Sequence, residues 1–179
     1  GGPARGHAGA AQVNRAPVVQ AAWPAPRGVH AFTTLRHGAG VSQAPFDHFN
    51  LGNKYAADGD DPATVARNRV QLAELAGLPS APHWLKQVHG TDVVRVDVPA
   101  DPAAPEPVAD ALVTTTPDVV LAILTADCLP VVFAAKNGRE IAAAHAGWPG
   151  LSKGMLEATL AAMRTPAADL VAWIGPAAG

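Results

Sequence analysis

Apolar and polar positions along the chain outline several short strands and two helices. Alternating apolar positions predict strands over residues 29–34, 83–88 and 92–98, and the last two would be joined around residues 89–91. Apolar, strand-like runs occupy residues 111–115, 119–125 and 129–135, and a final strand is predicted over residues 170–174. Most of the predicted secondary structure is therefore strand.

A turn signal joins two of these runs. Asn137 and Gly138 lie between residues 130–135 and 140–145, and this dipeptide favours the tight turn of an antiparallel hairpin. Because strands outnumber helices and several are joined by short turns, we predict an α/β fold of the α+β type. The expected architecture is a single-domain mixed-sheet sandwich packed with helices, rather than a doubly wound parallel sheet.

Two segments carry helix signals. Asp61 can cap a helix, Pro62 suits its first position and Gly77 suits the position just past its end, so a scaffold helix is predicted between Asp61 and Gly77. A second helix is predicted over residues 151–164, stopped by Pro166.

The remaining segments are a tail and a long loop. Residues 1–16 are rich in Gly and Ala and are predicted to form a flexible tail before a domain over residues 17–179. Residues 36–53 form a loop with Gly, Pro and Asn, and loops of this length inside a domain are usually functional. The alternative is a surface loop without a role. We expect the loop to border the functional site.

Composition excludes several classes of function. The 179 residues are 49 % apolar and 16 % charged, with a net charge of −2, which gives no general attraction to nucleic acid or anionic membranes. The longest apolar stretch, residues 119–132, is interrupted by Asp127 and is shorter than the about 20 residues that span a bilayer. A single cysteine argues against a disulfide-built secreted domain, and the N-terminus carries no secretory signal, so we predict a cytoplasmic protein.

Three side chains suited to metal binding share one local context. His89, Cys128 and His145 each follow an apolar strand-like run and precede a turn or a glycine. Two imidazoles and one thiolate suit zinc and leave a fourth position open, as catalytic zinc sites do; copper is the second candidate. Gly90 and Gly147 beside the histidines would let backbone or ligand approach closely.

Each of these residues also has a plain structural interpretation. A lone cysteine such as Cys128 is often a small buried apolar residue, and His89 alone would more often be a half-buried, hydrogen-bonded side chain. The three together favour a functional site. Asp127, next to Cys128, points to the other face if the strand is regular, but it can serve as an acid or base or orient a histidine if the backbone bends.

Several motifs resemble one known family. They are FTTLRHGAGVS, NLG, NRVQLAELAGLP, QVHGTDVV, ADALVT, LTADCLPVVF, AAAHAGWPGLSKGML and WIGPAAG. In this order they are similar to the YfiH family, also known as DUF152 or the laccase-domain family, which includes the FAMIN-type proteins. The resemblance runs from about residue 31 to residue 179.

The resemblance implies a fold, a metal and an activity. Members have a compact α/β sandwich, sometimes grouped with cysteine-hydrolase-like toxin domains, and bind one zinc through the residues that are His89, Cys128 and His145 here. They were first described as multicopper polyphenol oxidoreductases (laccases). They were later reassigned as enzymes that phosphorolyse adenosine, inosine, guanosine and methylthioadenosine and that deaminate adenosine. The implied partners are a purine nucleoside and phosphate.

Two departures from the family pattern concern phosphate. Pro149 stands where members have an arginine, which implies weaker phosphate binding. Members also continue past WIGP with further strands, helices and a basic segment, so the resemblance implies a domain lacking that part. We expect phosphate near Arg36 and the start of the helix after Gly150, and the purine stacked on Trp148 or Phe46. The alternative for Trp148 is core packing.

Two other functions stay open. One is a hydrolase in which Cys128 is the nucleophile and His145 or His89 is the base. The other is a zinc-binding remnant without catalysis. A true laccase is disfavoured, because it needs several coppers with many histidines and this chain has seven histidines, of which two are well placed.

Overall fold

The computed structural model describes residues 14–177 and contains two sheets, three α-helices and one 3₁₀ helix within that range. The order of elements is β1 (Val18–Gln20), β2 (Phe32–Thr34), α1 (Pro62–Ala76), β3 (Val93–Arg95), β4 (Ala111–Thr114), β5 (Leu129–Ala135), β6 (Ile141–Ala146), α2 (Trp148–Ser152), α3 (Met155–Ala162), η1 (Ala167–Asp169) and β7 (Leu170–Ile174). The predicted mixed α/β class is confirmed. None of the helices in residues 14–177 is long and apolar enough to cross a membrane.

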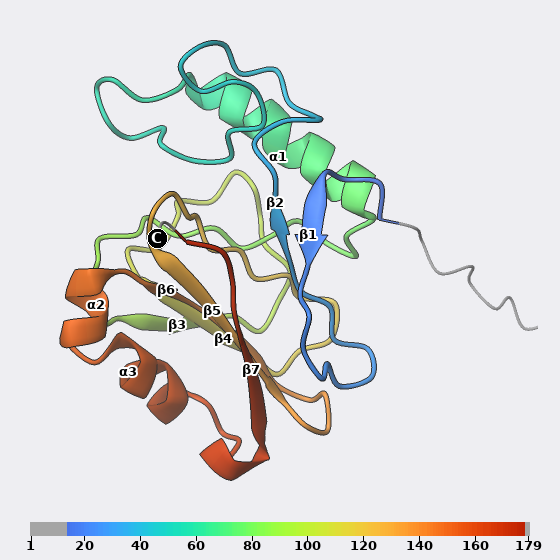
Figure 1. The fold of residues 1–179 in the computed structure, drawn as a ribbon, viewed down its shortest axis with the longest axis vertical. Helices are drawn as coiled ribbons and strands as arrows, with labels where there is room; N and C mark the ends of the chain where they lie inside the picture. The colour runs from blue at the N-terminus through green and yellow to red at the C-terminus, as the bar shows by residue number, and fades with distance from the viewer. Residues whose placement is uncertain (1–13, 178–179) are drawn as a thin grey trace, which may run out of the picture.

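The larger sheet has five strands in the order β3-β4-β6-β5-β7. All its pairs are antiparallel except β3 with β4, which is parallel. The predicted hairpin is β5–β6, and its turn places Gly138 at φ +73°, with the Gly138 amide donating to the Ala135 carbonyl. In Figure 1, α2 and α3 lie along one side of this sheet, and α1 lies with the small β1–β2 sheet at another end.

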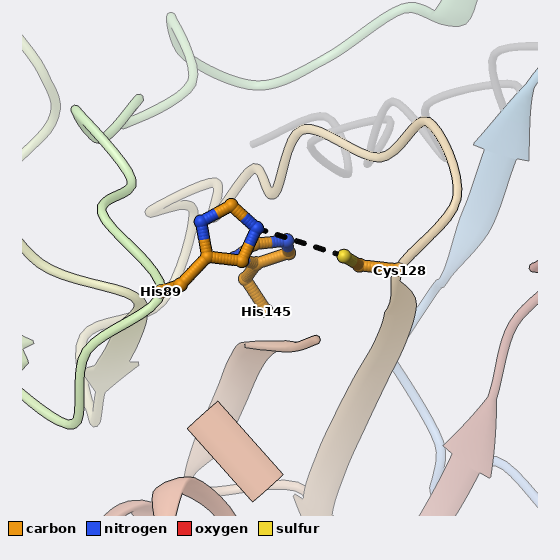
Figure 2. A group of neighbouring side chains, drawn as sticks. All are labelled: His89, Cys128 and His145. Atoms are coloured by element: carbon orange, nitrogen blue, oxygen red, sulfur yellow. Dashed lines mark hydrogen bonds between the residues drawn. The ribbon is translucent and has the colours of Figure 1, made fainter. Parts of the chain in front are cut away.

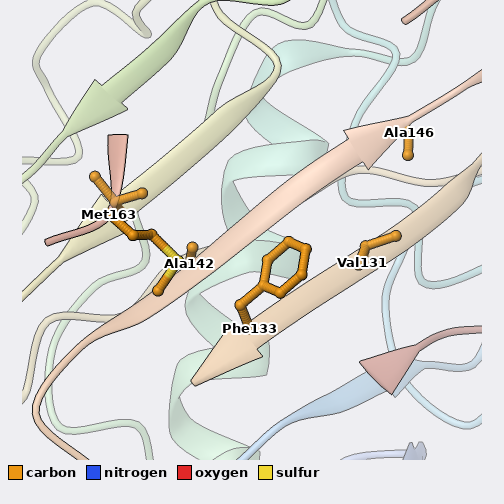
Figure 3. Packing of buried hydrophobic residues seen from close by; sticks show 6 residues of the cluster. Val131, Phe133, Ala142, Ala146 and Met163 are labelled. Atoms are coloured by element: carbon orange, nitrogen blue, oxygen red, sulfur yellow. The ribbon is translucent and has the colours of Figure 1, made fainter. Parts of the chain in front are cut away.

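Both faces of the large sheet are covered. Val131 and Phe133 of β5 and Ala142 of β6 pack with Met163, which follows α3 (Figure 3). On the opposite face, Leu112 of β4 packs with Leu85 in a second apolar cluster. Successive residues of β4 point to opposite faces of the sheet, and because both faces are covered, all four of its residues are buried.

The helix α1 forms as its signals predict. The Asp61 side chain accepts a hydrogen bond from the Thr64 amide at 3.0 Å, and Gly77 ends the helix in the left-handed conformation at φ +61°. The buried side of α1 receives Phe49 and Leu51 from the long loop. This loop has no helix or strand, as predicted, and its packing fixes it to α1.

Three predicted elements differ from the structure. The helix predicted over 151–164 is two helices, α2 and α3, because Gly154 at φ +92° interrupts them and α2 begins earlier, at Trp148. The runs 83–88 and 119–125 are not strands of a sheet; they meet neighbouring segments only through the isolated bridges His83–Leu121 and Lys86–Val108. Leu85 and Val119 are buried in the apolar cluster that covers one face of the large sheet, instead of within a strand of the sheet.

The predicted tail lies mostly outside the described residues. Of residues 1–16, the structure describes the last three. The Arg15 amide donates to the Leu75 carbonyl at 2.7 Å, and Ala16 is buried beside α1.

Candidate functional site

The three predicted ligands lie together at one end of the large sheet. Cys128 directly precedes β5 and His145 is near the end of β6, and the antiparallel register that pairs Pro130 with His145 places them side by side. His89 comes from the bend before β3. The potential ligand atoms of His89, Cys128 and His145 all lie within 4.8 Å of one another, pointing toward a common centre (Figure 2).

The spacing of the donors suits a metal ion. Cys128 Sγ is 3.7 Å from His89 Nε2, and the rings of His89 and His145 are edge-on with centroids 4.8 Å apart. Around a tetrahedral zinc, sulfur at about 2.3 Å and nitrogen at about 2.0 Å would lie roughly 3.6 Å apart. The cluster therefore fits a four-coordinate metal with one position open.

The close approach of the donors depends on Gly147. A Cβ atom at this position would lie 2.7 Å from Cys128 Sγ and 3.0 Å from His89 Cδ2, which is too close for either contact. The prediction that Gly147 permits a close approach is confirmed. At Gly90 a Cβ would meet no atom nearer than 3.7 Å, so glycine is not required there for space.

Asp110 organises the site from beneath. Its carboxylate, fully buried at the start of the β4 segment, accepts a hydrogen bond from His145 Nδ1 at 2.8 Å. It also accepts hydrogen bonds from the backbone amides of Val88, His89 and Gly90, at 3.1, 2.9 and 2.9 Å. One carboxylate thus fixes two of the three ligands, one through its ring and the other through its backbone.

This bonding explains an unusual backbone conformation. His89 has φ +59°, in the left-handed region that few residues other than glycine adopt. The three amides that converge on Asp110 hold the segment in this conformation and turn the His89 ring toward Cys128.

The electrostatics of Asp110 favour the carboxylate form. Burial raises the pKa of this group, but the hydrogen bonds from His145 and from the backbone amides outweigh burial and hold the pKa below its usual value. A carboxylate that accepts from His145 Nδ1 places the neutral ring's proton on that nitrogen. Nε2 is then left with a free lone pair for a metal, the arrangement common around metal-binding histidines.

The other predicted site residues have different environments. Asp127 lies in a bend, exposed, so the strand alternation that would point it away from Cys128 does not apply. Trp148 is 80 % exposed at the start of α2, so it is not a core residue. Phe46 is half-buried in the long loop.

Arg36 is engaged with its own loop. Its Nε donates to the Asp47 carbonyl and its Nη2 to the Pro45 carbonyl, both at 2.6 Å. Two of its donors therefore brace the loop. Its predicted contact with phosphate stays a prediction.

The far end of the long loop approaches the segments that carry the ligands. Gly52 and Asn53 line a pocket together with Gln87 and Leu124. The Gln87 side chain accepts from the Leu124 amide at 2.7 Å and donates to the Leu124 carbonyl at 2.9 Å. Gln87 precedes His89 by two positions, so this pocket is built on the same backbone as the ligand cluster.

The sequence prediction missed Asp110. A carboxylate at the entrance to an apolar strand is the one signal it gives, since a charge there needs buried partners. Its partners lie 20 to 35 positions away along the chain, and no local pattern points to them.

Comparison with known proteins places this geometry in a family. Residues 29–179 match the family described as multi-copper polyphenol oxidoreductase laccase. A Xylella fastidiosa (strain Temecula1) protein named purine nucleoside phosphorylase is 57 % identical over 164 residues, covering 90 % of this chain and 63 % of that protein. The Escherichia coli (strain K12) protein named purine nucleoside phosphorylase YfiH is 47 % identical, covering 88 % of this chain and 62 % of that protein.

Solved structures agree with the fold. The crystal structure of a Neisseria meningitidis protein of family DUF152 superposes with a TM-score of 0.79 at 43 % identity, covering 90 % of this chain and 63 % of that one. YlmD from Geobacillus stearothermophilus gives a TM-score of 0.76 at 31 % identity, covering 90 % of this chain and 65 % of that one. The chain thus spans less than two thirds of the length of these relatives.

Proposed function

This chain belongs to the multi-copper polyphenol oxidoreductase laccase family, also called YfiH or DUF152, and from that membership we propose that it is a zinc-dependent purine nucleoside phosphorylase. The reaction joins inorganic phosphate to the ribose of a purine nucleoside and releases the free base and ribose 1-phosphate. The observation that carries the proposal is the 57 % identity, over 90 % of this chain, to a protein of that name.

The His89–Cys128–His145 cluster supports zinc as the metal. A thiolate with two imidazoles is a soft donor set that suits zinc, and copper(I) is the other metal favoured by thiolate. Among residues 14–177 this is the one cluster of three such donors, whereas a laccase needs several coppers. Zinc bound there acts as a Lewis acid that polarises oxygen ligands.

The remaining roles fall to residues around the cluster. Asp110 holds the His145 ring and the backbone of His89 in the binding geometry. The exposed ring of Trp148 offers a surface on which a purine stacks, with Phe46 as the second candidate. We assign to Asp127, which is exposed and adjacent to Cys128, the role of acid or base toward the departing purine.

One incubation tests the proposal. Zinc-loaded protein is incubated with adenosine, with and without phosphate, and the products are separated by chromatography. Adenine and ribose 1-phosphate formed only with phosphate, and lost in Cys128→Ala, are the expected result. No product from a folded, zinc-loaded protein would refute the proposal and favour a metal-binding remnant.

The same incubation separates the alternatives. Inosine formed without phosphate would indicate hydrolytic deamination as the activity of the site.

A Cys–His nucleophile is suggested by the 3.7 Å contact between Cys128 Sγ and His89 Nε2. A thiol of that kind reacts with alkylating reagents, and zinc at one equivalent should protect it; full alkylation with zinc present would favour the hydrolase.

A further inference from the structure

A basic pocket, lined in part by Gln87 two positions before His89, has no role so far. It encloses about 270 Å³ and is lined by residues that include Lys54, Tyr55, Arg69, Lys86, Gln87 and Leu124. Every charged residue in its lining is a cation. Lys86 is exposed at the mouth of the pocket, and Lys54 and Arg69 are half-buried. Three cations without a carboxylate among the lining residues favour an anionic ligand.

The positive charge of the pocket is only partly balanced from outside. Lys54 Nζ lies 2.8 Å from Glu106 Oε1, and Arg69 Nη1 contacts the same oxygen. A single carboxylate is thus shared by two cations. Lys86 makes no ion pair with any carboxylate in residues 14–177, so the pocket keeps an excess of positive charge.

The ring of Tyr55 gathers the two lysines. Lys54 Nζ and Lys86 Nζ lie 5.3 and 5.1 Å from its centroid, within the range of cation–π attraction. The Tyr55 hydroxyl is already used, since it donates to Glu106 Oε2 at 2.6 Å. Both ammonium groups therefore lie near one ring, and an anion bound close to that ring would be attracted by both charges.

The loop that carries Lys54 and Tyr55 is closed by its own backbone. The Asp60 amide donates to the Asn53 carbonyl at 2.8 Å and the Gly59 amide to the Ala56 carbonyl at 3.0 Å. A Cβ at Gly59 would lie 2.2 Å from the Asn53 carbonyl oxygen, so glycine is needed for this closure. The two side chains are therefore presented by a tight loop rather than by an open strand.

We propose that this pocket binds a phosphate group, either as inorganic phosphate or as part of a sugar phosphate. The inference rests on the proposed phosphorolysis for the identity of the anion. Lys86 and Gln87 directly precede the His89 segment, and Gln87 is hydrogen-bonded on both sides of Leu124, which leads to Cys128. Phosphate bound in this pocket would therefore contact the same two chain segments that carry His89 and Cys128.

Two observations favour this pocket over the position expected from the sequence. The Arg36 guanidinium donates to two carbonyls of its own loop, whereas the Lys86 ammonium has no carboxylate partner within the described part of the chain. The helix after Gly147 is also short, since α2 spans Trp148–Ser152, so it offers little of the dipole on which an anion site at a helix start depends.

The test measures phosphate binding directly. Zinc-loaded protein is titrated calorimetrically with inorganic phosphate and, separately, with ribose 5-phosphate at constant ionic strength. Lys86→Gln should raise the Kd at least fivefold, and Lys86→Arg should restore most of the binding. Lys136→Gln, the same charge change at the β5–β6 turn, is the control and should leave the Kd within twofold.

Each outcome is informative. A loss confined to inorganic phosphate would assign the pocket to the attacking anion, and a loss confined to ribose 5-phosphate would assign it to the phosphorylated sugar. Unchanged binding of both ligands in folded Lys86→Gln would overturn the inference, even if phosphorolysis is observed. Lys86-dependent binding in a protein that does not cleave nucleosides would refute the proposed function but leave this inference standing.

Discussion

Replacing Asp110 by asparagine should weaken metal binding without unfolding the protein. The carboxylate accepts four hydrogen bonds, from His145 Nδ1 and from the amides of Val88, His89 and Gly90. Asparagine has the same shape but only one acceptor oxygen. If that oxygen keeps the bonds of Val88 and Gly90, which share one carboxylate oxygen, the NH₂ group faces the His89 amide and His145 Nδ1.

The consequence for His145 is a change of tautomer. An NH₂ group donates to Nδ1, so the ring proton moves to Nε2, the nitrogen that would bind the metal. The His89 amide meanwhile loses its acceptor, which weakens the support for the left-handed backbone of that residue. Losing such a partner of a metal ligand typically costs about 10- to 100-fold in metal affinity, which corresponds to roughly 1.4 to 2.7 kcal/mol.

The assay is competition for zinc against a chromophoric chelator, with circular dichroism to verify the fold. Asp97→Asn removes the same charge from an exposed carboxylate and is the control. Because the asparagine NH₂ group should donate to His145 Nδ1, the NMR signals of this ring should show a proton on Nε2 in the variant and on Nδ1 in the parent. Zinc affinity within twofold of the parent in a folded Asp110→Asn would refute the reasoning.

Four further changes test other parts of the structure. Gly147→Ala should lower zinc affinity more than tenfold and cost about 1–3 kcal/mol of stability, measured by chelator competition and urea unfolding, because its Cβ would meet Cys128 Sγ and His89 Cδ2. Burial raises the pKa of Glu140, but bonds from Arg164, Thr165 and Arg95 hold it below its usual value. The ionised Glu140 carboxylate therefore stabilises the fold above about pH 4.3, and this stabilisation is lost as the pH falls below that value. The Tm of the parent should exceed that of Glu140→Gln at neutral pH, and the difference should shrink below about pH 4.3. Partial desolvation and the hydrogen bond to Glu106 raise the pKa of Tyr55, the single tyrosine, to about 12, and titration by ultraviolet absorbance should show this value rather than about 10. Pro149→Arg should lower the KM for phosphate in the phosphorolysis assay, and an unchanged KM would remove position 149 from phosphate binding.

The elements predicted correctly are those specified by neighbouring residues. The β5–β6 hairpin depends on Asn137 and Gly138, and α1 depends on its caps at Asp61 and Gly77, so each is readable within a few positions. Gly154 lies within the helix predicted over residues 151–164, and a glycine there is a signal that the helix can break. Its left-handed conformation breaks that helix, although an isolated glycine in a helical pattern often does not.

The two strands that were wrong show what apolar patterns leave open. Leu85 and Leu121 belong to a buried cluster on one face of the large sheet, so their segments need apolar residues as much as a strand does. Whether such a segment lies within a sheet or across its face depends on distant partners. For residues 83–88 and 119–125 those partners supply only isolated bridges.

The three donors could be picked out because each follows an apolar, strand-like run, but the residue that orients two of them could not. Cys128 and His145 are brought together by the hairpin that the turn signal predicts. The position of His89 depends on Asp110, which lies 21 residues further along the chain and accepts its amide. The residue types therefore predicted the candidate ligands, whereas only the fold shows that Asp110 orients two of them.

The contacts that arrange the three metal-binding donors do not involve the residue expected to affect phosphate binding. The bonds of Asp110 to His145 and to the 88–90 backbone, and the space left by Gly147, are present in the folded chain by itself, so the donors are arranged before a metal arrives. Pro149 takes part in none of these contacts. If Pro149 replaces a family arginine, as the resemblance implies, then under the proposed function this change would weaken phosphate binding and leave the donor cluster intact, and Lys86 is the cation that we propose binds phosphate instead.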